Sequence, residues 1–277
     1  MTIAITGATG HLGRLAITAI KARAPKSDLV ALVRNPAADL GVPARAFDYT
    51  KPETFTALTG VDVLVLISSN DFNDRAGQHK AVITAAKAAG VGRIIYTSIL
   101  KGDTSPLILA EDHIATEAAL KASGLAYTLL RNGWYTENYT GSLAASIEHG
   151  ALIGASGEGR IASAARADYA EAIAVVALGE GHDNKTYELA GDVPHSMADF
   201  AAEVSRQTGK TIPYNNLPQD VYAGILQSFG LPEGFALVLA DSDIKAASGG
   251  LLDESHTLSQ LIGRPTTPIA ATIKAAL

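Results

Sequence analysis

The hydrophobic positions in the first half of the chain form short runs, and segments with helical spacing separate these runs. The predicted strands cover residues 3–5, 29–33, 44–47, 63–67, 93–96 and 127–130. Residues 29–33 form a continuous apolar run, which is typical of a parallel strand buried on both faces. Apolar residues recur with helical spacing over residues 12–20, 76–89 and 110–122. The alternation predicts an α/β fold with a doubly wound parallel sheet.

Turn residues mark the ends of the predicted helices. Thr50-Lys51-Pro52-Glu53 has the pattern of a capping box with proline in the first turn, and it would open a short helix that ends at Gly60. The next two helices stop at Gly90 and Gly124. We therefore expect each helix between the strands to end at a glycine in the left-handed conformation.

Three evenly spaced glycines follow the first strand. The segment Thr6-Gly7-Ala8-Thr9-Gly10-His11-Leu12-Gly13 runs directly into the first helix. In such a segment the first glycine permits the turn, the second lets backbone amides approach a pyrophosphate, and the third lets the helix pack closely on the sheet. The phosphates then lie at the positive end of the helix. This context predicts a dinucleotide site with contacts from Gly7, Thr9, Gly10, His11, Leu12 and Gly13.

The regular alternation ends after residue 133. We expect a helix over 134–147, a glycine-rich stretch over 150–159, a helix over 167–178 and a seventh strand over 186–190. A helix near 196–208, a strand over 211–214 and later helices follow. The predicted division is a dinucleotide-binding domain over 1–133 and 158–192, and a smaller substrate-binding lobe over 134–157 and 193–277.

Composition excludes several classes of protein. The 277 residues are 47% hydrophobic, which is enough to bury a full α/β core. The formal charge of −6, without a basic stripe, argues against a nucleic-acid partner. The absence of cysteine removes disulfides, thiolate nucleophiles and Cys-ligated metals, and no two of the seven histidines fall within one helical turn. A metal site is left open only through ligands distant in the sequence, and we expect none.

The chain shows no sign of a membrane segment. Its first predicted strand begins at residue 3, and no apolar run approaches the ~20 residues that a membrane span needs. We therefore expect a cytoplasmic protein with no membrane partner. The oligomeric state stays open.

Arg34 indicates which dinucleotide is bound. An NAD-binding fold places an acid on the ribose hydroxyls about 20 residues after the glycine loop. Here that region contains Arg34 and no Asp or Glu from Leu29 to Ala38. An arginine suits a 2′-phosphate because its guanidinium is a planar fork of donors. The alternative is a solvated loop arginine, but position, charge and the missing acid together favour NADP(H).

Several motifs resemble the NmrA-like branch of the atypical short-chain dehydrogenases. They are the glycine segment, Leu32-Val33-Arg34-Asn35, His113-Ile114-Ala115-Thr116-Glu117 and Leu130-Arg131-Asn132. Within this branch the chain is most similar to the type 2 NAD(P)H:quinone reductases and the triphenylmethane dye reductases, nearly end to end. The resemblance implies a Rossmann-type sheet of about seven strands with a smaller C-terminal α/β substrate lobe. It also implies NADP(H) as cofactor.

The proton donor of ordinary members of this superfamily is missing. None of the nine tyrosines is followed four residues later by lysine, and in register with the extended members His113 takes the lysine's place and Leu109 the tyrosine's. Hydride delivery to an isolated ketone leaves a basic alkoxide that needs an acid, whereas delivery to a quinone leaves a phenolate-type anion that water can protonate. The sequence therefore favours an NADPH-dependent reductase of a planar acceptor, a quinone or a dye.

A non-catalytic protein that binds the dinucleotide would also lack the tyrosine and lysine of the proton donor. Some NmrA-like proteins bind the dinucleotide as redox sensors, contact a protein partner and do not turn over. The greater similarity to the reductases favours the enzyme.

Ligands of this architecture lie beyond the carboxyl ends of the strands. Ser98 falls where the superfamily's catalytic serine lies, although a turn serine that bonds the local backbone is an alternative. His113, one turn from Glu117, would bond a ribose hydroxyl, with an exposed helix pair as the alternative. By resemblance Asn132 and Tyr135 contact the nicotinamide side, and Tyr135 joins Ser98 and His113 as a catalytic candidate.

The other candidates are assigned by their place at strand ends. Further cofactor contacts are expected from Asp48, Ser68, Ser69, Asn70 and Thr97. The planar acceptor would contact Phe72, Ile99, Trp134 and Tyr139. For Trp134 and Tyr139, ordinary packing between the lobes is an equal alternative.

Arg34→Ala should weaken the binding of NADPH alone. Loss of one charged clamp should cost ~1.5–3 kcal/mol of NADPH binding and leave NADH unaffected. The measurement compares dissociation constants of both cofactors for the wild type and the variant. An equal loss for both cofactors, or tighter NADH binding by the wild type, contradicts the assignment.

Overall fold

The computed structural model describes residues 1–71 and 73–277, so the predicted acceptor contact Phe72 lies outside the described residues. The chain divides into two compact units. Unit 1 comprises residues 1–102, 112–132 and 166–188, and unit 2 comprises residues 103–111, 133–165 and 189–277. The assignment of the substrate to the smaller lobe stays a prediction.

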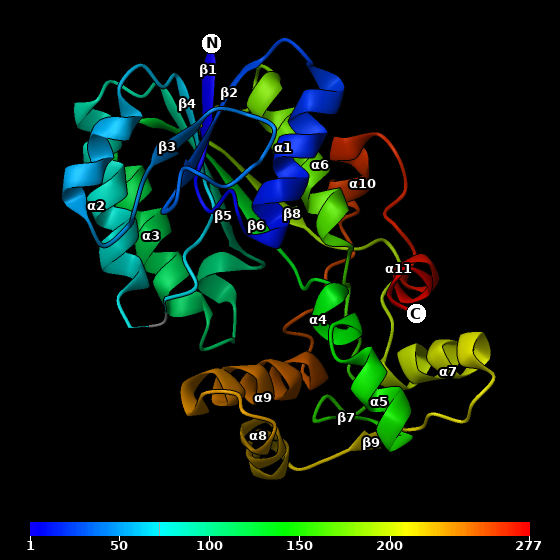
Figure 1. Ribbon diagram of the computed structural model, residues 1–277. Helices are drawn as coiled ribbons and strands as arrows, with labels where there is room; N and C mark the ends of the chain where they lie inside the picture. Colours follow the sequence, from blue (N-terminus) through cyan, green and yellow to red (C-terminus); the bar gives the residue numbers. More distant parts are fainter. Residues whose placement is uncertain (72) are drawn as a thin grey trace. The chain divides into compact units, whose positions relative to one another are not determined.

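Unit 1 is built around a seven-stranded sheet in the order β3-β2-β1-β4-β5-β6-β8 (Figure 1). The strands are β1 (Thr2–Ile5), β2 (Asp28–Val33), β3 (Ala44–Ala46), β4 (Val63–Leu66), β5 (Arg93–Ile99), β6 (Ala126–Asn132) and β8 (Lys185–Leu189). Neighbouring strands from β3 to β6 are all parallel, with Ala4 opposite both Val30 and Leu64. The strand order reverses beside β1, where an open α/β sheet binds its ligand. The predicted doubly wound sheet is confirmed.

Helices cover both faces of this sheet (Figure 1). The helix α1 (His11–Arg23) lies beside α6 (Arg166–Leu178), and the 3₁₀ helix η1 (Pro52–Leu58), α2 (Arg75–Ala88) and α3 (Ala110–Ser123) lie on the other side. Side chains alternate along a strand, so Ile94 and Tyr96 of β5 point to the face covered by η1, α2 and α3. Tyr96 is fully buried there.

Two predictions of helix ends are wrong. Thr50 does not cap a helix, because its hydroxyl and its N–H both donate to the Asp48 carboxylate, and the element that follows is a 3₁₀ helix. The first helix does not stop at a glycine but at Ala24, which is followed by Pro25 and has an extended φ of −139°. A residue before proline is pushed out of the helical region, so proline alone ends this helix. Gly90 and Gly124 have positive φ, as predicted.

Unit 2 is mostly helical, with one small parallel sheet. Its elements are α4 (Glu137–Thr140), α5 (Leu143–His149), β7 (Leu152–Gly154), α7 (Met197–Thr208), β9 (Tyr214–Asn216), α8 (Gln219–Ser228), α9 (Glu233–Ala247), α10 (Thr257–Ile262) and α11 (Ile269–Ala276). β7 pairs with β9. The continuous helix predicted over 134–147 is wrong, since Tyr135 forms a β-bridge with Ala164. The strand predicted over 211–214 begins only at Tyr214, after Pro213, which has no N–H to donate.

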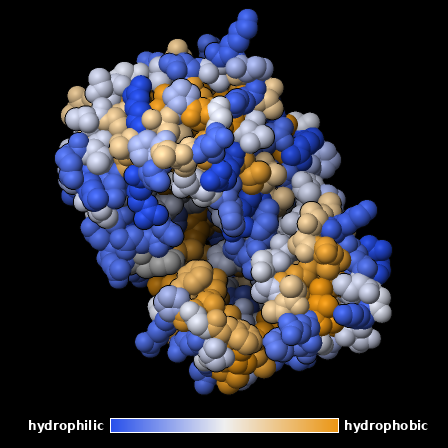
Figure 2. Space-filling view, in the orientation of Figure 1, coloured by the Kyte–Doolittle hydropathy of each residue, from blue (hydrophilic) through white to orange (hydrophobic). Residues whose placement is uncertain are grey.

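The surface of α8 and α9 is partly apolar. Val221, Phe229, Phe235 and Leu237 are 38–60% exposed, and Figure 2 shows hydrophobic surface over these helices. Among the described residues no helix is both long enough and apolar enough to cross a bilayer.

Candidate functional site

The glycine segment joins β1 to α1 by a tight turn. Gly7 has φ +59°, the N–H of Gly10 donates to the Gly7 carbonyl at 2.9 Å, and the N–H of Arg14 donates to the Gly10 carbonyl at 3.0 Å. A Cβ on Gly13 would lie 2.4 Å from the Gly7 carbonyl oxygen. Only glycine at position 13 therefore lets α1 lie this close to the end of β1.

The start of α1 has the character of an anion site. Gly10 is the N-cap residue, and the N–H groups of His11, Leu12 and Gly13 precede the first intrahelical hydrogen bond. The first turn contains no acidic side chain that would neutralise the positive end of the helix. These donors, with no side chain at Gly10, fit a pyrophosphate.

Arg34 and Asp48 follow the ends of the next two strands. Arg34 is exposed, and it makes no hydrogen bond or ion pair with any residue that the structure describes. Asp48 organises its own turn, since its carboxylate accepts from the Thr50 N–H at 3.0 Å and from the Thr50 hydroxyl at 2.8 Å. Those hydrogen bonds lower the pKa of Asp48. The guanidinium fork of Arg34 is thus available to a phosphate.

The residues after β4 are held by neighbouring elements. The N–H of Ser68 donates to the Thr97 hydroxyl at 2.9 Å, and the Ser69 hydroxyl donates to Gln78 at 3.0 Å. Asn70 is exposed. The ends of β4 and β5 are therefore tied together, with Thr97 and Ile99 both buried in β5. Their roles in binding stay predictions.

A buried polar cluster, which we call the Tyr96 cluster, lies between β5, α2 and α3. It consists of His79, Tyr96, His113 and Thr116, joined by hydrogen bonds. The Tyr96 hydroxyl is 2.8 Å from His113 Nδ1, and His79 Nδ1 is 2.9 Å from the Thr116 hydroxyl. Burial, reinforced by the Arg75 charge, lowers the pKa of His79 and of His113 to about 3. Both rings are neutral at physiological pH.

The sequence interpretation missed Tyr96, His79 and Arg75. The four-residue spacing of Arg75 and His79, which puts both on one face of α2, was the available signal. Tyr96 lies in a run of mostly apolar strand residues. Nothing in the sequence distinguishes it from a tyrosine that only packs in the core.

The exposed helix pair proposed as the alternative for His113 and Glu117 is wrong. His113 is 7% exposed and Glu117 is 3% exposed. Glu117 instead forms two hydrogen bonds with the Arg131 guanidinium, at 2.7 and 2.9 Å, and accepts from the Ser98 hydroxyl at 2.7 Å. Ser98 lies within β5, so it is not a turn serine either.

Burial and ion pairing oppose one another at Glu117. Desolvation raises the pKa of its carboxyl, but the hydrogen bonds and charge of Arg131 outweigh it and leave the pKa below its ordinary value. Arg131 also pairs with Glu188 at 2.9 Å. The Ser98 hydroxyl is thereby committed to a structural ion-pair network, and its catalytic role stays a prediction.

The remaining candidates lie at the end of β6 and in unit 2. Asn132 is the last residue of β6 and is buried. Trp134, Tyr135 and Tyr139 belong to unit 2, where Trp134 is 8% exposed and the Tyr139 ring packs at 5.7 Å from Phe200. Burial raises the pKa of the Tyr139 phenol. Their contacts with cofactor or acceptor stay predictions.

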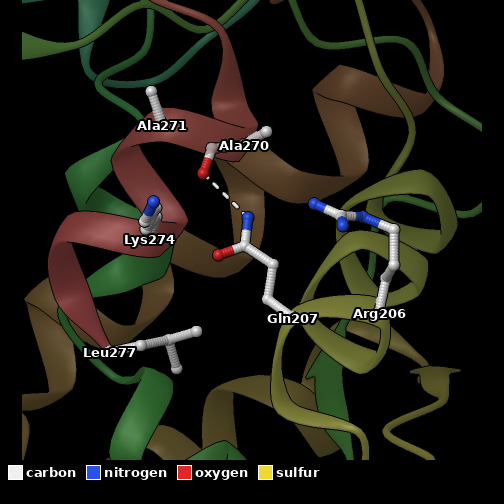
Figure 3. Close-up of a pocket in the computed structure, with 6 residues that line it drawn as sticks. All are labelled: Arg206, Gln207, Ala270, Ala271, Lys274 and Leu277. Carbon is white, nitrogen blue, oxygen red and sulfur yellow. Dashed lines mark hydrogen bonds between the residues drawn. The ribbon is translucent and has the colours of Figure 1, made fainter.

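A separate open hollow lies between α7 and α11 of unit 2 (Figure 3). Gln207 spans it by donating to the Ala270 carbonyl at 2.8 Å, and Arg206 at its edge is paired with Glu203. None of the predicted site residues lines this hollow.

The geometry of β1, the glycine turn and α1 agrees with a family match. Residues 7–178 match the family model described as NAD(P)H-binding. The chain belongs to this family.

Individual relatives extend over the whole chain. It is 53% identical over 277 residues to quinone oxidoreductase 2 of Escherichia coli K12, covering 98% of this chain and 97% of the relative. A crystal structure of the NADPH-dependent quinone oxidoreductase of E. coli, complexed with NADPH, has a TM-score of 0.95 and 52% identity, covering 99% of both chains. Citrobacter triphenylmethane reductase complexed with NADP(H) has a TM-score of 0.92 and 36% identity, covering 100% of both chains. The resemblance to quinone and dye reductases is confirmed.

Gly10→Val should remove cofactor binding and leave a folded protein. A Cβ at position 10 would be 3.2 Å from the Gly7 carbonyl, a contact that a small shift relieves, but a branched side chain stands where the amides face the phosphate. Calorimetric titration with NADPH and circular dichroism test this. Gly234→Val, near the start of α9 with open space around it, is the matched control. Retained NADPH binding by folded Gly10→Val would move the phosphate site elsewhere.

Arg131→Met should destabilise the protein by ~3–5 kcal/mol, because it leaves the buried Glu117 carboxylate with only the half-exposed Lys121 ammonium, at 3.4 Å, as a cationic partner. Since the folded pKa of Glu117 is depressed, its contribution is present above the unfolded pKa and is lost as pH falls through the folded value. Urea unfolding at pH 7 and pH 3 should show a smaller difference between variant and wild type at the lower pH. A constant difference would show that Glu117 does not drive the effect.

Proposed function

We propose that this protein is an NADPH-dependent reductase that transfers hydride to a planar acceptor such as a quinone or a dye. One observation carries the proposal: the glycine turn and the first amides of α1 are intact, while Leu109 and a neutral, buried His113 occupy the sequence positions of the proton donor and its lysine. The similarity over the full chain to a quinone reductase and a triphenylmethane reductase supports it. A cytoplasmic location stays a prediction.

Each predicted contact has a physical task in this reaction. The amides at the start of α1 would hold the pyrophosphate, and Arg34 would hold the 2′-phosphate. His113 would bind a ribose hydroxyl. Bound NADPH supplies the hydride, so the protein's task is to orient two flat molecules. Without a tyrosine at position 109, the proton on the reduced acceptor comes from water, which suffices for a phenolate-type product.

Purified protein should oxidise NADPH with a small quinone, without added metal or flavin, and should show little activity with simple ketones. The loss of reduced nicotinamide is followed by its absorbance near ~340 nm. A redox sensor would bind NADPH and NADP with different affinities and leave the absorbance unchanged with every acceptor. Tight NADPH binding without turnover across a panel of quinones and dyes would therefore favour the sensor.

Truncation of Trp134 or Tyr135 to Ala should lower quinone turnover more than NADPH affinity, if these aromatics line the acceptor site. Steady-state kinetics and NADPH titration separate the two effects. Phe229→Ala, at a position 60% exposed in unit 2, is the control and should change neither. Equal losses in both measurements would assign the aromatics to the cofactor instead.

A further inference from the structure

We propose that Tyr96 and His79 are positioning residues for His113: they hold its ring with the proton on Nε2, so that it donates a hydrogen bond to a ribose hydroxyl of the cofactor. This inference rests on the proposed function and deepens it, because it explains how a chain without the lysine would hold the ribose.

The donor and acceptor roles are set first at His79. Its Nε2 is 2.9 Å from the backbone N–H of Ser69, which can only donate, so this nitrogen accepts. The proton of the neutral ring must then sit on Nδ1, and it points to the Thr116 hydroxyl at 2.9 Å. The Thr116 hydroxyl in turn donates a hydrogen bond to the Asp112 carbonyl at 2.8 Å. This series of hydrogen bonds begins at an amide N–H, which can only donate, and ends at a carbonyl, which can only accept. The direction of every hydrogen bond in it is therefore fixed.

The orientation of the Tyr96 hydroxyl follows from His79. The phenol oxygen lies 3.5 Å from His79 Nδ1 and 2.8 Å from His113 Nδ1. Because His79 Nδ1 already carries a proton, the phenol cannot donate to it. The Ser68 and Thr116 hydroxyls also interact with the phenol oxygen, but His113 Nδ1 at 2.8 Å is its shortest contact, so we assign the donation to His113 Nδ1. A neutral imidazole that accepts at Nδ1 carries its proton on Nε2. The tautomer of His113 is thus determined by its neighbours.

The cluster also keeps His113 uncharged. Arg75, which donates to the Ser69 carbonyl at 2.7 Å, places a buried positive charge near both histidines and opposes their protonation. The site therefore offers the ribose a neutral donor where related enzymes offer the ammonium of lysine.

The donating nitrogen of His113 is not enclosed. Within the described chain Nε2 has no acceptor, and it is not among the buried atoms that lack a partner. His113 keeps 7% of its surface exposed although Tyr96 holds its other nitrogen in the core. The N–H on Nε2 is available to a ligand hydroxyl.

The first test reads the tautomer in protein without cofactor. Two-bond ¹H–¹⁵N spectra of His113 in the wild type should show protonated Nε2 and unprotonated Nδ1. Tyr96→Phe removes the phenolic donor and should give a mixture of both tautomers, and the Kd for NADPH should rise ~3- to 10-fold. Tyr127→Phe is the matched control, since its hydroxyl has no partner among the described residues and neither reading should change.

The second test asks whether Tyr96 acts through the tautomer. His113→Gln supplies an amide donor without a tautomer choice, so adding Tyr96→Phe to it should leave the Kd for NADPH unchanged. A further loss in this background, or a wild-type spectrum with the proton on Nδ1, overturns the proposal.

His113→Ala with wild-type affinity for NADPH also overturns it. Both readings are made without an acceptor, so a protein that binds NADPH but reduces no quinone would refute the proposed function alone. The wild-type spectrum remains decisive if a Tyr96 variant does not fold.

Discussion

The close approach of α1 to the end of β1 is the constraint on which the nucleotide site depends. The missing Cβ at Gly13 allows the helix to begin against the Gly7 carbonyl, and the positive φ of Gly7 turns the chain toward it. With a larger residue at position 13, the helix axis would shift and its first amides would no longer lie at the reversal of strand order beside β1. The position and direction of these amides, which we expect to bind the phosphates, follow from one backbone contact.

On the face of the sheet covered by α2 and α3, buried ionisable groups are either paired or neutral. The Glu117 carboxylate is charged and is paired with the charged Arg131. The rings of His79 and His113 are neutral, so neither adds an unpaired charge to this layer. A lysine at position 113 would add a second buried cation near Arg75, at a high cost in desolvation. A neutral ring avoids that cost and still offers an N–H.

The sequence was most informative where a residue type has one physical use. The strand runs and the glycine turn could be predicted because burial on both faces and sterics leave few alternatives. The role of Arg34 in the choice of cofactor stays a prediction. The Tyr96 cluster was not readable, since its members come from β5, α2 and α3, and only the alternation of the strand brings them to one face. The prediction of a helix cap at Thr50 was wrong for a related reason. A threonine hydroxyl can cap a helix or donate to a nearby carboxylate, and here the Asp48 carboxylate takes the hydrogen bond.

Tyr96 belongs at once to the hydrophobic core and to the hydrogen-bonded cluster beside His113. Its ring belongs to the same buried layer as Ile94, Leu66 and the apolar face of α2, so repacking of this layer would also move the hydroxyl. On the role that we propose for Tyr96, thermal stability and cofactor affinity share a residue and cannot be tuned separately. Efforts to stabilise such a reductase by redesigning its core should leave this layer intact and work on the α1–α6 side of the sheet.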